Sequence, residues 1–143
     1  MAVNVGQRNV PDTLSNRKCY AVFWCNDLCV HTLRIMSNKS VLESPHIDVA
    51  ERIRILVMDI FASTFTANKI DIRSEDITDI HTRSELQNRA VNGLYELLGY
   101  IPIASKLFQM RKRKREYWTR LAKEALTFTK AWRESERKKF EGV

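Results

Sequence analysis

Four long stretches of the chain carry apolar residues at alternating three- and four-residue spacing, and almost nothing interrupts them. The 143 residues include only four Gly and three Pro. That spacing places the apolar side chains on one face of a helix, and the scarcity of helix-breaking residues favours long helices over short strands and turns. The sequence therefore predicts an all-α protein of amphipathic helices that bury their apolar faces against one another.

The first two helices are predicted at about 12–37 and 45–69. The first should end in the turn-forming stretch Asn38-Lys39-Ser40. The second should begin with Ser44 as its N-cap and Pro45 as its first helical residue, because a serine oxygen accepts hydrogen bonds from free backbone N–H groups and proline has no N–H to satisfy. The apolar face of the first helix is made by Tyr20, Trp24, Leu28, His31 and Ile35.

The third helix is predicted at about 79–110, after a polar loop at 71–78, with its start near Asp76 or Asp79. Pro102 lies inside this helical pattern. A proline there removes one backbone hydrogen bond and clashes with the preceding turn, so we expect a kink in that turn. The alternative is a break into two shorter helices.

The fourth helix is predicted at about 114–140. Four helices of 25 to 30 residues joined by short loops are typical of an antiparallel up-down-up-down four-helix bundle, and 143 residues fit a single domain. An apolar seam along the last helix is made by Trp118, Leu121, Ala125, Phe128 and Trp132, the last of them near the open end of the helix.

Some apolar residues of the first helix fall off its main stripe, namely Val22, Phe23, Val30 and Leu33. Apolar residues that a helix does not bury inside its own domain need a second surface to cover them. We therefore expect the protein to self-associate.

The net positive charge of the chain lies entirely in its last 33 residues. Residues 111–143 carry twelve Lys and Arg against five Asp and Glu, a net charge of +7, whereas residues 1–110 carry twelve of each sign. A neutral scaffold with one concentrated basic element favours the docking of a polyanion, and nucleic acid is the commonest polyanion in a cell. The basic run that opens this segment is Arg111, Lys112, Arg113, Lys114 and Arg115.

A second set of cations follows the basic run at helical spacing and forms a basic ridge beside the apolar seam. The alternative for both sets is an ordinary solvated face. However, five cations at a helix start oppose the helix macrodipole, which costs a few tenths of a kcal/mol per charge, so this placement favours a functional role. The basic ridge consists of Arg120, Lys123, Lys130, Arg133 and Arg137.

The cysteines and histidines form no recognisable metal-binding or catalytic motif. Cys25 and Cys29 lie four residues apart, but His31 points elsewhere on the helix and no fourth ligand is near in sequence, so we predict packed, reduced thiols and no metal. His46 and His81 have no neighbouring Ser or Cys in a recognisable nucleophile motif and are expected at helix ends or in the core.

The three tryptophans divide between core and surface. The spacing of Trp24 and Trp118 predicts that both are buried, whereas Trp132 lies next to Arg133 near the end of the last helix and is the one expected at an interface.

No glycine-rich phosphate loop, paired-carboxylate motif or zinc-protease signature occurs, and we predict neither an enzyme nor a cofactor. No apolar stretch reaches the roughly 18 residues that a membrane span needs, and residues 1–13 lack the pattern of a secretory signal. These observations predict a cytoplasmic protein without a membrane partner.

Four phrases of the sequence, taken in order over about residues 9–140, resemble the accessory variability determinants of diversity-generating retroelements. Those proteins are similar in turn to the four-helix-bundle proteins encoded by intervening sequences in 23S ribosomal RNA genes. The phrases are Asn16-Arg17-Lys18-Cys19-Tyr20, Thr66-Ala67-Asn68-Lys69-Ile70, Arg83-Ser84-Glu85-Leu86-Gln87-Asn88 and Lys130-Ala131-Trp132-Arg133-Glu134-Ser135-Glu136-Arg137-Lys138.

The resemblance implies a homopentameric ring of four-helix bundles with a basic surface. It also implies a protein with no catalytic site that binds a reverse transcriptase and its template RNA, and that supports mutagenic cDNA synthesis. RNA, with DNA as a second candidate, would then contact the basic run and the basic ridge. The alternative is a structural oligomer, or a protein of the intervening-sequence type, that acts through protein contacts only.

Overall fold

The computed structural model describes residues 20–141, and this part of the chain contains helices and no strand. The helices are α2 (Tyr20–Met36), α3 (Lys39–Leu42), α4 (Ile47–Lys69), α5 (Ile77–Leu107) and α6 (Lys112–Glu141). The predicted all-α class is confirmed. The predicted helical residues 12–19 lie outside the described residues.

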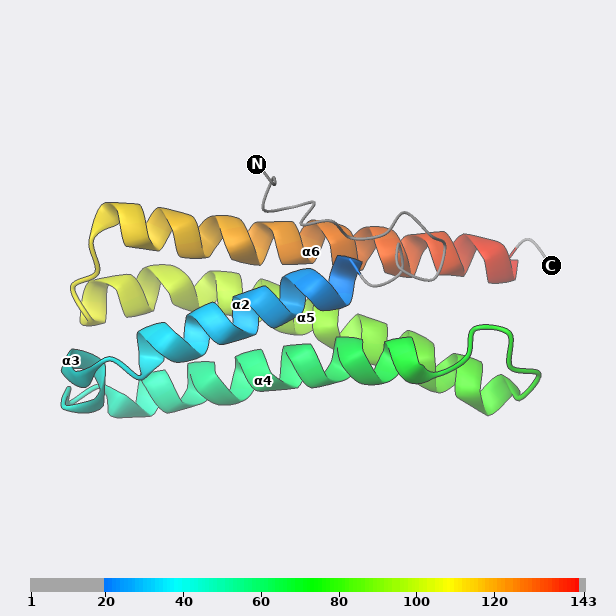
Figure 1. Cartoon of the computed structure of the whole chain (residues 1–143), viewed down its shortest axis with the longest axis horizontal. Helices are drawn as coiled ribbons and strands as arrows, with labels where there is room; N and C mark the ends of the chain where they lie inside the picture. Colours follow the sequence, from blue (N-terminus) through cyan, green and yellow to red (C-terminus); the bar gives the residue numbers. More distant parts are fainter. Residues whose placement is uncertain (1–19, 142–143) are drawn as a thin grey trace, which may run out of the picture.

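The four long helices lie side by side along the long axis of the molecule (Figure 1). α4 packs against α2 and α5, and α6 packs against the same two helices, so each long helix has two neighbours around one core. The aliphatic positions of the predicted stripes fill this core, because burying their side chains removes apolar surface from water. Fully buried side chains at its centre include Leu28, Ile53, Ile60, Leu94, Leu97, Ile101 and Trp118.

α4 and α5 approach each other closely at Gly93. A Cβ atom added at Gly93 would lie 2.8 Å from Cγ1 of Ile60, a buried residue of α4. Only glycine fits there without movement of the neighbouring helix.

The connection between α2 and α4 differs from the sequence prediction. The stretch at 38–40 was expected as a turn, but Lys39–Leu42 form α3, whose Val41 is buried. Pro45 was expected as the first residue of the next helix. Instead α4 begins two residues later, with His46 at the N-cap position, and the Ser44 Oγ accepts a hydrogen bond from the backbone N–H of His46 at 3.0 Å. The serine thus caps a turn that precedes the helix.

The start of α5 confirms the earlier of the two expected positions. Asp76 is the N-cap, and its Oδ1 accepts a hydrogen bond from the backbone N–H of Thr78 at 2.9 Å. Pro102 lies inside the continuous helix Ile77–Leu107, so the alternative of a break into two helices is wrong. The kink at this proline stays a prediction.

The turn between α5 and α6 differs from the prediction, because α5 ends at Leu107 and not at 110, and α6 begins at Lys112 and not at 114. Gln109 adopts a left-handed backbone conformation, with φ of 52°. The backbone N–H of Met110 donates to the Ser105 carbonyl at 2.9 Å, and that of Gln109 donates to the Lys106 carbonyl at 3.3 Å. These two bonds form a Schellman motif, which ends α5 at Leu107 although the apolar pattern continues.

Candidate nucleic-acid interface

The basic run lies directly after the Schellman turn, across the first turn of α6. All five side chains are exposed, and none forms an ion pair with another residue between 20 and 139. The first turn of α6 contains no acidic residue. The charges therefore stand in solvent at the end of the helix whose dipole they oppose.

The end of α2 contributes further groups to the surface around the basic run. The ring of His31 lies 4.9 Å from the ring of Tyr117 in an edge-to-face arrangement. Burial lowers the pKa of His31, and the positive charges of Lys114 and Arg34 lower it further, so both cations lie near the imidazole. His31 was expected on the core stripe of α2, but it lies half-buried at the border of the core.

The basic ridge divides into two parts. Arg120 and Lys123 are exposed near the basic run, and the guanidinium of Arg120 lies 5.5 Å from the centre of the Tyr117 ring. The other three are farther along α6. Lys130 Nζ donates to the Tyr95 hydroxyl at 2.9 Å, and Arg133 Nη1 donates to the Asn88 Oδ1 at 3.1 Å.

Arg137 pairs with Glu134 at 2.8 Å, one turn earlier on the same helix. At about 1.5 Å of rise per residue, some 40 Å separate Arg111 from Arg137. The structure therefore does not bring the ten predicted residues into one site. It joins the basic run to Arg120 and Lys123, and it places the remaining three cations toward the other end of α6, where two of them contact α5.

A buried ion pair that sequence reasoning missed lies at this other end. The Arg83 Nε donates to the Glu136 Oε1 at 2.8 Å, and Nη2 donates to Oε2 at 2.6 Å. The two side chains are only 3% and 5% exposed. The amide of Gln87 donates to the same Oε1 at 2.9 Å. The carboxylate thus has three donors, as a buried charge requires.

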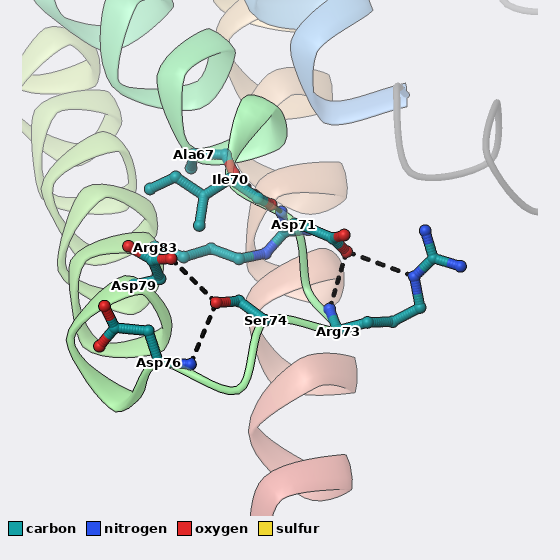
Figure 2. A network of polar contacts seen from close by, with 8 residues as sticks. All are labelled: Ala67, Ile70, Asp71, Arg73, Ser74, Asp76, Asp79 and Arg83. Carbon is teal, nitrogen blue, oxygen red and sulfur yellow. Dashed lines mark hydrogen bonds and ion pairs between the residues drawn. The ribbon is translucent and has the colours of Figure 1, made fainter.

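Arg83 also reaches across to the end of α4, as Figure 2 shows. Its Nη1 donates to the carbonyl of Ala67 at 2.8 Å and to that of Ile70. Carbonyls at a helix C-terminus lack intrahelical partners and carry partial negative charge, so a guanidinium satisfies both needs. One side chain therefore ties α4 and α6 to α5.

The loop between α4 and α5 has its own hydrogen bonds beside Arg83 (Figure 2). Asp71 Oδ1 accepts from the backbone N–H of Arg73 at 2.9 Å, and the Ser74 hydroxyl donates to the Asp79 Oδ2 at 2.9 Å. These Asx- and serine-type contacts stabilise the conformation of the loop.

Trp132 belongs to this buried cluster, so its predicted place at an interface is wrong. The residue is 8% exposed and packs with Ala21 and Ala67. The Arg83 guanidinium lies 5.3 Å from the centre of its ring. A cation stacked on the indole explains how an aromatic side chain beside charged residues can still be buried.

Two of the three cysteines lie in the described part of the chain, and both are packed in the core. Cys25 and Cys29 are buried free thiols, and the Cys25 Sγ lies 3.6 Å from the Thr129 Oγ1. Burial raises the pKa of Cys25 to about 11, which keeps the thiol protonated near neutral pH. No group of three His, Cys, Asp or Glu in the described part of the chain could hold a metal ion.

No family model, curated protein or solved structure matches this chain. Among the described helices, none is both long enough and apolar enough to cross a membrane.

The basic start of α6 differs in kind from the Arg83–Glu136 cluster. In the cluster the charges are neutralised by protein groups and withdrawn from solvent. At the start of α6 the cations are solvated and carry no carboxylate partner from a described residue, so they can exchange small counterions for phosphates at little cost in protein contacts.

Proposed function

We propose that the chain is a non-catalytic accessory protein of a diversity-generating retroelement, which binds template RNA together with the element's reverse transcriptase and supports mutagenic cDNA synthesis. The observation that supports RNA binding best is the set of five exposed cations at the start of α6, with no described carboxylate paired to them. The part played by a reverse transcriptase rests on the sequence resemblance.

Binding at this surface would depend on phosphate and little on sequence. Lys and Arg side chains that meet the backbone of a nucleic acid position it and gain affinity from the counterions they release. Arg120 and Lys123 extend the surface by two turns of α6. RNA is the first candidate on the resemblance, and DNA would meet the same charges.

We further propose that the four long helices form an antiparallel up-down-up-down bundle and that five copies assemble into a ring. The outward face of α4 supports self-association, because Ile55, Met58 and Phe65 recur on it at three- and seven-residue spacing and are 58%, 45% and 43% exposed. Val30 on α2 is also exposed, at 42%. Native mass spectrometry should give about five times the 16.7 kDa chain mass. A 16.7 kDa monomer at micromolar concentration would contradict the ring.

Replacement of all five residues 111–115 with Gln should weaken binding to RNA of any sequence and flatten its dependence on salt. Each phosphate contact that is lost should reduce the slope of log K against log salt by about 0.7 to 0.9. Fluorescence anisotropy with a labelled RNA over a salt series measures both quantities. The helix should survive, because the removed charges oppose its dipole.

A charge-matched control separates position from net charge. It carries five Gln substitutions on other elements, at Lys39, Arg54, Lys69, Arg73 and Arg89. This control should keep most of the affinity and slope. Equal losses in both variants would mean that only net charge matters. Unchanged affinity in the first variant would favour the alternative, a structural oligomer that acts through protein contacts.

A further inference from the structure

Tyr117 is an exposed aromatic ring beside the basic run. It is 43% exposed, although the residue that follows it is fully buried. The Arg120 guanidinium lies 5.5 Å from the ring centre, and His31 from α2 contacts the ring edge-to-face at 4.9 Å and 77°. The ring is therefore held from two elements while much of its surface stays open to solvent.

The groups around Tyr117 are suited to a nucleic-acid strand. The charges of Lys114 and Arg34 both lower the pKa of His31, so α6 and α2 each place a cation on the same part of the surface as the ring. Burial lowers the pKa of His31 and so favours its neutral form. The neutral imidazole packs against the Tyr117 ring and adds no charge to the surface. The nearby cations can neutralise the phosphates on either side of a base that meets the ring.

We propose that Tyr117 and Arg120 form a stacking platform for an unpaired base, so that this surface prefers single-stranded RNA to duplex RNA. A base can lie against a tyrosine ring or against a guanidinium that itself stacks on one. In a duplex the flat faces of the bases are covered by their neighbours, so a duplex can meet only the cations. This inference rests on the proposed RNA binding and adds which form of RNA is bound.

The test uses three labelled ligands of equal length: a 12-nucleotide single strand, its duplex, and a ribose-phosphate strand without bases. The native protein should bind the base-bearing strand about 5- to 150-fold more tightly than the abasic one, the range expected for one stacked base. Tyr117→Leu should lose that preference, and its affinity for the duplex and the abasic strand should stay within about twofold. Its salt slope should not change, because no phosphate contact is removed.

Two variants guard against a trivial loss of structure. Tyr117→Phe keeps the ring and should bind as the native protein does. Tyr95→Leu removes another tyrosine, 50% exposed on α5 with Lys130 over its ring, and should keep the preference for bases. Circular dichroism and urea melts confirm that each variant is folded.

The outcomes separate this inference from the proposed function. Binding that is salt-dependent but equal for base-bearing and abasic strands would overturn the stacking platform and leave RNA binding standing. An equal loss in the Tyr95→Leu variant would overturn the assignment to Tyr117. No binding to any of the three ligands at low salt would overturn the proposed function and this inference together.

Discussion

Glu136→Ala should lower the free energy of unfolding by about 3 to 5 kcal/mol, the usual cost of removing one partner from a buried ion pair. The variant leaves the Arg83 guanidinium buried against Trp132 without its carboxylate. It also removes the acceptor of the Gln87 amide. Urea unfolding followed by circular dichroism measures the change.

The matched control is Glu134→Ala, two residues earlier on α6. Its carboxylate pairs with Arg137 on the surface and is 41% exposed, so its loss should change stability by less than about 1 kcal/mol. A similar effect of the two substitutions would mean that the buried pair contributes no more than a surface pair.

The same ion pair gives stability a dependence on pH. Burial raises the pKa of the Glu136 carboxyl, but the hydrogen bonds and charge of Arg83 and the bond from Gln87 outweigh burial and hold the pKa below its usual value. A depressed carboxyl pKa contributes stability that is fully present above the unfolded pKa and is lost as pH falls through the folded pKa. As the pH falls, the free energy of unfolding should therefore decrease more steeply for the native protein than for the Glu136→Gln variant, as urea melts over a pH series would measure.

Trp118→Ala should also lower the free energy of unfolding by about 3 to 5 kcal/mol, because Trp118 is the largest fully buried side chain among the described residues. Its indole N–H donates to the Thr32 Oγ1 at 2.9 Å, between α6 and α2, and Thr32 is itself fully buried. The loss thus combines a cavity with an unpaired hydroxyl. A change below about 1 kcal/mol in urea melts would contradict burial of the ring.

A double-mutant cycle separates the two parts of the effect. Trp118→Phe leaves the Thr32 hydroxyl unpaired, and Thr32→Val leaves the indole N–H unpaired, at about 1 to 3 kcal/mol each. The double variant has neither polar group buried, so its loss should be smaller than the sum of the two single losses. Additive losses would mean that the hydrogen bond contributes little.

The predictions from the sequence were most accurate where the local pattern, such as apolar spacing or a capping residue, agrees with how the helices pack. Apolar spacing identified the seam of α6, in which Trp118, Leu121 and Ala125 are buried. Asp76, one of the two expected starts of α5, is its N-cap because an aspartate oxygen is a good acceptor for free N–H groups. The end of α5 was missed because no residue type marks it. Gln109 takes the left-handed conformation that usually signals glycine, so the end of α5 was placed three residues too late.

The buried ion pair was missed because charged residues such as Arg83 and Glu136 are expected at the surface of a helix. The core stripe of α5 runs through Leu97, Leu94 and Ala90, and the same spacing continued backwards reaches Gln87 and Arg83. Their position thus predicted burial while their chemistry predicted exposure. Burial of Arg83 is possible because Glu136 on α6, 53 residues away, pairs with it. The sequence of α5 alone does not identify this partner. The ten predicted interface residues do not form one site, because helical spacing shows which residues share a face of α6 but not which neighbouring helix contacts that face.

The order in which the helices pack has a consequence for how the domain opens. Three of the four pairs of long helices join helices that are neighbours along the chain, with only the short α3 between α2 and α4. By contrast, α2 and α6 meet through residues such as Cys25 and Thr129, 104 positions apart. Closing so long a loop costs the most chain entropy, and contacts of that kind are typically among the last to form. Transient separation of α2 from α6 would then expose Cys25, so the reactivity of this thiol should report partial unfolding.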